Sequence, residues 1–142
     1  MRFATLSVLL GILPTCHHSP VDGPEDQEAR LEFSVTRSLQ TASADTVRVS
    51  RISAGQMAIE GVISTPNPCY QIAATLAEDA GSLTLRLTAT RQGGFCIQVL
   101  AAFTYEARIS ALAPRTYSIV VVHTYPSTGW EERTYQLRAE VP

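Results

Sequence analysis

The 142-residue chain contains three cysteines and three histidines, residue types that bind metal ions or take part in catalysis as nucleophiles or bases. They are Cys16, His17, His18, Cys69, Cys96 and His123. The first three are adjacent and could offer donors to a metal ion. A stable metal site also needs neighbouring groups that hydrogen-bond to its ligands and orient them. Three adjacent donors on a linker are expected to lack such groups. We therefore expect no metal site there and interpret the two histidines as part of a polar linker. His123 has no carboxylate nearby in the sequence to make it a general base, and we expect it to be a structural residue.

Motifs for enzyme catalysis are missing from the sequence. It contains no glycine-rich phosphate loop, nucleophile elbow or Cys-x-x-Cys pair. Glu131 and Glu132 are adjacent, so in a strand they would point to opposite faces, which does not suit an acid–base pair. We therefore expect a protein that is not an enzyme and has no cofactor and no small-molecule substrate.

The composition predicts one folded domain. Hydrophobic residues make up 45% of the chain, charged residues 17%, and the formal net charge is -2. Disorder needs fewer hydrophobic residues and a higher net charge. Nucleic-acid binding needs a basic surplus, so we expect no nucleic-acid partner.

The N-terminus has the pattern of an export signal, which we place at residues 1–15. One positive charge precedes an apolar run that is too short to span a bilayer. Leu13-Pro14-Thr15-Cys16 resembles the lipobox of bacterial lipoproteins, with leucine three residues before the cysteine. The resemblance implies cleavage before Cys16 and lipidation of that residue. Pro14 and Thr15 depart from the small residues usual there, and the alternative is an uncut or conventionally cut signal with a free Cys16.

The segment after the lipobox is expected to be a tether over residues 16–29. It holds two prolines, a glycine and four acidic residues, and it has little to bury. By the sorting habit of the lipoprotein family, His17 after the cysteine implies the outer membrane. The resulting hypothesis is an exported cell-envelope protein, held to the membrane by its lipid, with another envelope protein as its partner.

The two remaining cysteines are expected to pair. If Cys16 carries lipid, Cys69 and Cys96 are left together in an oxidising compartment, where disulfides persist. Closing a loop of about 27 residues would stabilise the fold by roughly 3.6 kcal/mol in the chain-entropy model. We expect this bridge to fasten one end of a single sheet.

From Arg30 onward the hydrophobic pattern has a period of two, typical of strands with one buried face. The alternating segments are residues 31–36, 47–50, 57–63, 83–88, 97–105 and 135–141. Residues 117–123 are apolar on both sides, which predicts a central strand. Residues 70–77 contain helix-favouring alanines, but the turn residues on both sides favour a strand. Seven or eight strands over residues 30–142 predict an all-β sandwich.

A short motif adds to this prediction. Residues Leu112, Pro114 and Tyr117 have the L-x-P-x-x-Y spacing. It resembles the turn into strand F of immunoglobulin-like domains, the tyrosine corner, where the tyrosine hydroxyl bonds to upstream backbone. The resemblance implies a single antiparallel immunoglobulin-like β-sandwich. Ile119 stands where antibody-type domains have their second cysteine, so the expected disulfide lies elsewhere.

Three loops are candidate recognition surfaces, at residues 65–70, 91–95 and 125–131. Their candidate binding residues are Asn67, Tyr70, Gly93, Gly94, Phe95, Tyr125 and Trp130. Tyrosine and tryptophan on loops provide large contact areas at low entropic cost. The alternative is that Trp130 and Phe95 cover the open ends of the core.

The order of these loops is similar to that in chagasin-type inhibitors of papain-like cysteine proteases. Those immunoglobulin-like proteins present an Asn-Pro loop, a Gly-Gly loop and a tryptophan loop, matched here by Asn67-Pro68, Gly93-Gly94 and Trp130. Cys69 follows directly where that family has a longer threonine-rich stretch, and no Arg-Pro precedes Trp130. The main prediction is therefore a non-enzymatic envelope lipoprotein that acts as a binding or structural module, with protease inhibition as the alternative.

Overall fold

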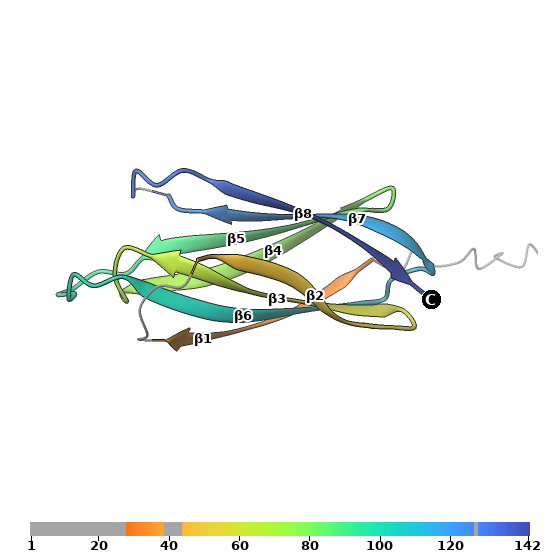
Figure 1. The fold of residues 1–142 in the computed structure, drawn as a ribbon, viewed down its shortest axis with the longest axis horizontal. Coiled ribbons are helices and arrows are strands. Elements are labelled where there is room, and N and C mark those ends of the chain that lie inside the picture. Colours follow the sequence, from red (N-terminus) through yellow and green to blue (C-terminus); the bar gives the residue numbers. More distant parts are fainter. Residues whose placement is uncertain (1–27, 39–43, 127) are drawn as a thin grey trace, which may run out of the picture.

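The computed structural model describes residues 28–38, 44–126 and 128–142. The predicted signal peptide, Cys16 and the tether up to residue 27 lie outside the described residues. The described residues form eight strands and no helix (Figure 1). They are β1 (Arg30–Ser38), β2 (Thr46–Ser53), β3 (Gln56–Thr65), β4 (Tyr70–Asp79), β5 (Ser82–Arg91), β6 (Ala101–Ser110), β7 (Arg115–Thr124) and β8 (Arg133–Val141).

The strands form two four-stranded sheets that pack face to face, which confirms the predicted all-β sandwich. Sheet A has the order β1-β6-β3-β2 and sheet B the order β4-β5-β7-β8. At the edges, β1 lies nearest β4 and β2 lies nearest β8. Among the described residues, β5 and β7 pair in parallel and the other five neighbouring pairs are antiparallel. The parallel pair departs from the two antiparallel sheets of an immunoglobulin domain. It arises because the chain crosses to sheet A in β6 and then returns beside β5 in the same direction.

The core lies between the two sheets and is built from alternate residues of the strands. It includes Ile59 and Ile109 of sheet A, and Leu85 and Val121 of sheet B, which are buried completely. The predicted central strand over residues 117–123 is confirmed, since β7 lies between β5 and β8. The segment with the alanines is strand β4, as its flanking residues indicated.

One predicted strand is too long. The alternation from Ile97 predicted a strand over residues 97–105, but β6 begins at Ala101. The neighbouring strands end at this point, because Thr65 is the last residue of β3 and pairs with Ala101. Residues 97–100 therefore have no strand to pair with, and they form part of the connection from sheet B to sheet A.

The strand register divides the sandwich into two ends. The connections 66–69, 92–100 and 125–132 lie together at one end, which we call the loop end (left in Figure 1). The opposite end, which we call the terminal end, holds the start of β1 and the end of β8. The described chain therefore starts and finishes at the same end, and the three candidate loops lie at the other.

Gly61 provides a test of the packing in sheet A. A β-carbon there would overlap the Tyr105 side chain and the Thr46 carbonyl oxygen. Since neither can move without disturbing the sheet, Gly61→Ala is expected to lower the free energy of unfolding by about 2–3 kcal/mol. Urea unfolding followed by the fluorescence of Trp130, the single tryptophan, measures this. Gly93→Ala is the control, because nothing lies within 4 Å of its β-carbon position. Equal stability of the two variants would contradict the account.

Candidate functional site

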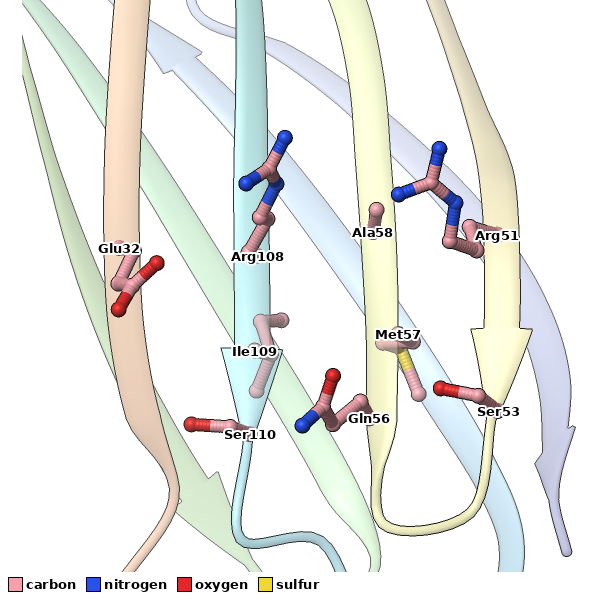
Figure 2. A pocket seen from close by; sticks show the side chains of 9 residues that line it. All are labelled: Glu32, Arg51, Ser53, Gln56, Met57, Ala58, Arg108, Ile109 and Ser110. Atoms are coloured by element: carbon pink, nitrogen blue, oxygen red, sulfur yellow. The ribbon is translucent and has the colours of Figure 1, made fainter.

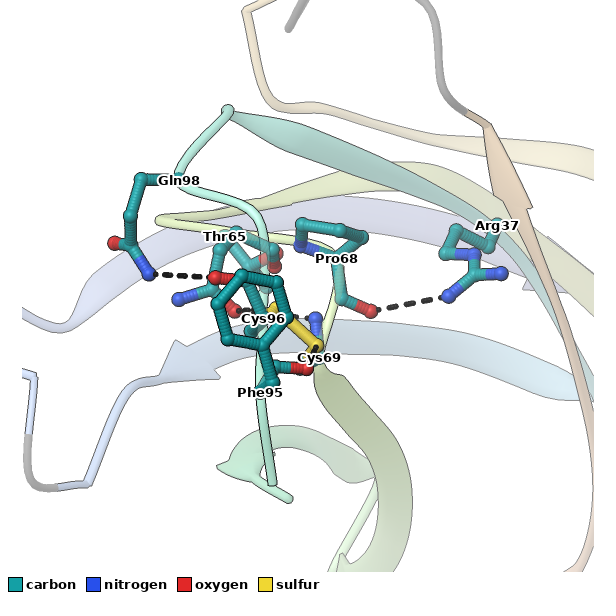
Figure 3. Close-up of a disulfide and its surroundings, with 8 residues drawn as sticks. Arg37, Thr65, Pro68, Cys69, Phe95, Cys96 and Gln98 are labelled. Atoms are coloured by element: carbon teal, nitrogen blue, oxygen red, sulfur yellow. Dashed lines mark hydrogen bonds between the residues drawn. A yellow bond between two sulfur atoms is a disulfide. The ribbon is translucent and has the colours of Figure 1, made fainter. Parts of the chain in front are cut away.

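The disulfide predicted from the cysteine count is present. Cys69 and Cys96 are bonded, with their Cα atoms 6.0 Å apart (Figure 3). The expectation that it fastens a single sheet was wrong. Cys69 lies on the connection from β3 in sheet A to β4 in sheet B, and Cys96 on the connection from β5 in sheet B to β6 in sheet A. The bridge therefore joins the two crossovers at the loop end.

Hydrogen bonds fix the first of these crossovers. The side-chain oxygen of Asn67 accepts from the Cys69 backbone N–H at 3.1 Å, and the Thr65 hydroxyl donates to the Asn67 carbonyl at 2.7 Å. The backbone N–H of Gln92 donates to the Cys69 carbonyl at 2.8 Å, which connects the second crossover to the first. Asn67 is buried. Its side-chain oxygen and its backbone carbonyl both serve the turn.

The second crossover carries the main surface feature of the loop end. Four large apolar side chains project from residues 95–100, which we call the apolar loop. Phe95 is 97% exposed, Ile97 54%, Val99 50% and Leu100 55%. No charged residue occurs between Arg91 and Glu106. Since neighbouring exposed apolar side chains commonly mark an interaction site, this loop is the candidate functional site.

The sequence-predicted loop residues divide into two groups. Tyr70 and Tyr125 are buried. Trp130 is half-buried and packs edge-on against Tyr125, with ring centres 5.4 Å apart. Trp130 therefore covers the core, as the alternative interpretation expected, whereas Phe95 does not. Gly93 and Gly94 are exposed beside the apolar loop.

A buried polar cluster lies under the loop end. His123 is fully buried, and its Nδ1 lies 3.3 Å from Asp45 Oδ2 while its Nε2 lies 3.1 Å from the Tyr105 hydroxyl. Because a carboxylate can only accept, Nδ1 carries a proton and donates to Asp45, while Nε2 and the Tyr105 hydroxyl form a second hydrogen bond. Sequence inspection found no carboxylate for His123 because Asp45 is 78 residues away. Complete burial and hydrogen bonds at both ring nitrogens favour the structural role that we expect for His123.

Asp45 is the centre of this cluster. Its carboxylate, only 1% exposed, accepts from the Ser64 N–H at 2.9 Å and from the Tyr125 hydroxyl at 3.0 Å, and it lies 3.1 Å from the Arg133 guanidinium. Burial raises the pKa of Asp45, but hydrogen bonds from His123, Ser64 and Tyr125 outweigh it, so the pKa falls from 3.8 to about 2. Asp45 precedes β2 of sheet A, while His123, Tyr125 and Arg133 belong to β7, its extension and β8 of sheet B. The cluster thus fastens the two sheets together.

Burial also affects the hydroxyl groups of the cluster. It raises the pKa of both Tyr105 and Tyr125, which keeps them protonated hydrogen-bond donors. The cluster can hold the charged Asp45 carboxylate in the interior, and we assign the cluster a structural role.

The predicted tyrosine-corner bond is not formed. Tyr117 is buried, but its hydroxyl has no hydrogen-bond partner in the described part of the chain. The guanidinium of Arg115 lies 5.1 Å from the centre of its ring. Leu112 is buried and its N–H donates to the Gly55 carbonyl at 3.0 Å, while Pro114 is exposed. The motif therefore fixes a turn against the β2–β3 hairpin, without the hydroxyl contact.

Within residues 28–38, 44–126 and 128–142, no three His, Cys, Asp or Glu side chains gather in a way that could hold a metal ion. None of these segments forms a helix able to cross a membrane.

Fold and site together define a disulfide-bonded β-sandwich with an exposed apolar loop. No family model, curated protein sequence or solved structure matches the chain.

Proposed function

We propose that this protein is a lipid-anchored, non-enzymatic binding module of the cell envelope, and that its apolar loop contacts a protein partner. The observation that carries the proposal is the exposure of Phe95, Ile97, Val99 and Leu100 on one connection. Fully burying a side chain of this kind contributes about 1.5–3 kcal/mol. The disulfide at Cys96 holds the loop in place before binding, which lowers the entropic cost of ordering it.

The position of the loop favours a partner other than the anchoring bilayer. A flexible tether of about thirteen residues spans roughly 20 Å on average. The ten-residue strands separate the terminal end from the loop end by roughly 33 Å. If residues before β1 form the proposed anchor and tether, they join the sandwich at the terminal end, and a tether shorter on average than the sandwich favours an apolar loop that faces away from the membrane. We therefore place its partner among envelope proteins.

The anchor can be tested separately from the loop. Cells that express the full chain are expected to incorporate labelled palmitate into it, and the Cys16→Ala variant is expected to take up none. An unlabelled wild-type chain would contradict the lipoprotein proposal and leave the binding role of the loop to be judged on its own test.

Phe95→Asp is expected to leave the free energy of unfolding within about 0.5 kcal/mol of the wild type, because the side chain supports nothing in the fold. Urea unfolding followed by Trp130 fluorescence measures this. Ile52→Asp is the matched control, since Ile52 is a 43% exposed apolar residue of β2 toward the terminal end. A loss of several kcal/mol in Phe95→Asp would show that the loop is part of the core.

A second candidate function is inhibition of papain-like cysteine proteases. It is favoured by the gathering of the three loops at one end of the sandwich. Burial of Asn67 and Pro68 and half-burial of Trp130 leave Gly93-Gly94 as the most accessible of the matched elements. An assay of papain with micromolar protein decides between the two functions, since the binding-module proposal predicts no inhibition.

A further inference from the structure

A β-bulge in β2 changes the direction of one arginine. The register between β2 and β3 shifts between Val49 and Arg51, so Ser50 is the extra residue. After the bulge, Arg51 pairs with Ala58. Bulges often re-aim side chains beside functional sites, and this one brings Arg51 to the outer face of sheet A.

Arg51 completes a row of four residues across the outer face of sheet A, which runs through β1, β6, β3 and β2 in that order. The row consists of Glu32, Arg108, Ala58 and Arg51, each paired with the next. The small side chain of Ala58 leaves a hollow of about 270 Å³ on the outer face. Figure 2 shows the guanidinium groups of Arg108 and Arg51 on either side of Ala58, with polar side chains below them. These lower residues are Ser53, Gln56 and Ser110.

Both guanidinium groups keep donors available. Arg108 uses its Nε to bind Glu106 Oε1 at 2.6 Å, so its two terminal nitrogens remain available. Within the described residues, no ion pair or hydrogen bond holds the guanidinium of Arg51. The nearby Glu60 is paired with Arg48 at 2.8 Å. Arg51 contributes to the lowered pKa of Glu60 but forms no ion pair with it, so its guanidinium donors are available beside the hollow.

We propose that this hollow binds an oxyanion, a phosphate or a carboxylate group, between Arg51 and Arg108. Guanidinium groups bind both kinds of oxyanion through paired hydrogen bonds. Two strand spacings, roughly 10 Å, separate the two arginine backbones, and their side chains can converge on one group above Ala58. Glu32 borders the hollow beyond Arg108, so the anion lies on the Ala58 side of Arg108. The hollow is smaller than most small-molecule pockets, which run about 300–1,000 Å³, so it suits one charged group and its nearest atoms.

The test is a titration of the purified full chain with sodium phosphate and, separately, with sodium acetate, at ionic strength held constant with chloride. NMR of ¹⁵N-labelled arginine side chains reports the Nε signals of each arginine. We expect saturable shifts at Arg51 and Arg108, with a dissociation constant on the order of 1 mM for the preferred anion. The two titrations identify which oxyanion the hollow prefers.

Two variants and a control make the result decisive. Arg51→Gln is expected to weaken binding about tenfold or more, because it removes the charge and its paired donors. Ala58→Leu fills the hollow without changing a charge and should have the same effect. Arg138→Gln, an exposed arginine of β8 on the other sheet, should bind as the wild type does. Non-saturable shifts of similar size at all arginines, or unchanged binding in Arg51→Gln, would overturn the proposal.

Discussion

Asp45→Ala is expected to lower the free energy of unfolding by about 3–5 kcal/mol, because it leaves the buried donors of His123 and Tyr125 without their acceptor, at about 1–3 kcal/mol for each donor. The substitution removes the carboxylate that His123, Tyr125 and Arg133 share. His123 is fully buried, so solvent cannot replace the lost acceptor without opening the sandwich. Urea unfolding followed by Trp130 fluorescence measures the loss.

The same site predicts a dependence on pH. The pKa of Asp45 is lowered from 3.8 to about 2, so its stabilising contribution is complete above pH 4 and is lost as the pH falls toward 2. The difference amounts to roughly 2 kcal/mol. Asp45→Asn cannot ionise, so the stability difference between wild type and this variant should shrink by that amount between pH 4 and pH 2. Parallel stability curves over this range would show that Asp45 does not carry a buried charge.

The second large effect concerns the disulfide. Replacing both Cys69 and Cys96 with serine should lower the free energy of unfolding by roughly 3.6 kcal/mol, because the unfolded chain regains the freedom of a closed loop. The bridge joins residues separated by 27 positions in the sequence. Urea unfolding of the wild type with and without reductant provides an independent measurement of the same quantity.

A single substitution, Cys16→Ser, is the control for the disulfide. It removes the third cysteine without touching the bridge and is expected to leave the stability unchanged. If the double variant is as stable as the wild type, the bridge contributes nothing to the fold. The apolar loop would then be held by its backbone contacts alone.

The strands were largely predictable because alternation reports directly on which side chains face a core. Residues 57–63 and 83–88 show this, and both lie within strands as expected. The start of β6 was not predictable, since the alternation runs on through Ile97 and Val99 after the neighbouring strands have ended. A pattern of side chains cannot reveal where the backbone loses its hydrogen-bonding partner.

The same limit explains what was missed at the site. Phe95 was predicted as a candidate, but Ile97, Val99 and Leu100 were assigned to a strand over residues 97–105. The available signal was the uncharged run from residue 92 to residue 105, which contains the Gly93-Gly94 pair. The partnership of Asp45 and His123 had no signal at all, because residues 78 positions apart meet only when two sheets pack.

We propose that the apolar loop binds a protein at the loop end of the sandwich, opposite the end that would join the proposed lipid anchor. The most direct test introduces a photo-crosslinking amino acid at Phe95 of the full chain, expressed in its native host, and irradiates the intact cells. The account predicts a discrete protein adduct that disappears when Ile97→Asp is added and does not form when the crosslinker replaces Ile52. The absence of an adduct at Phe95, or the same adduct at both positions, would contradict it.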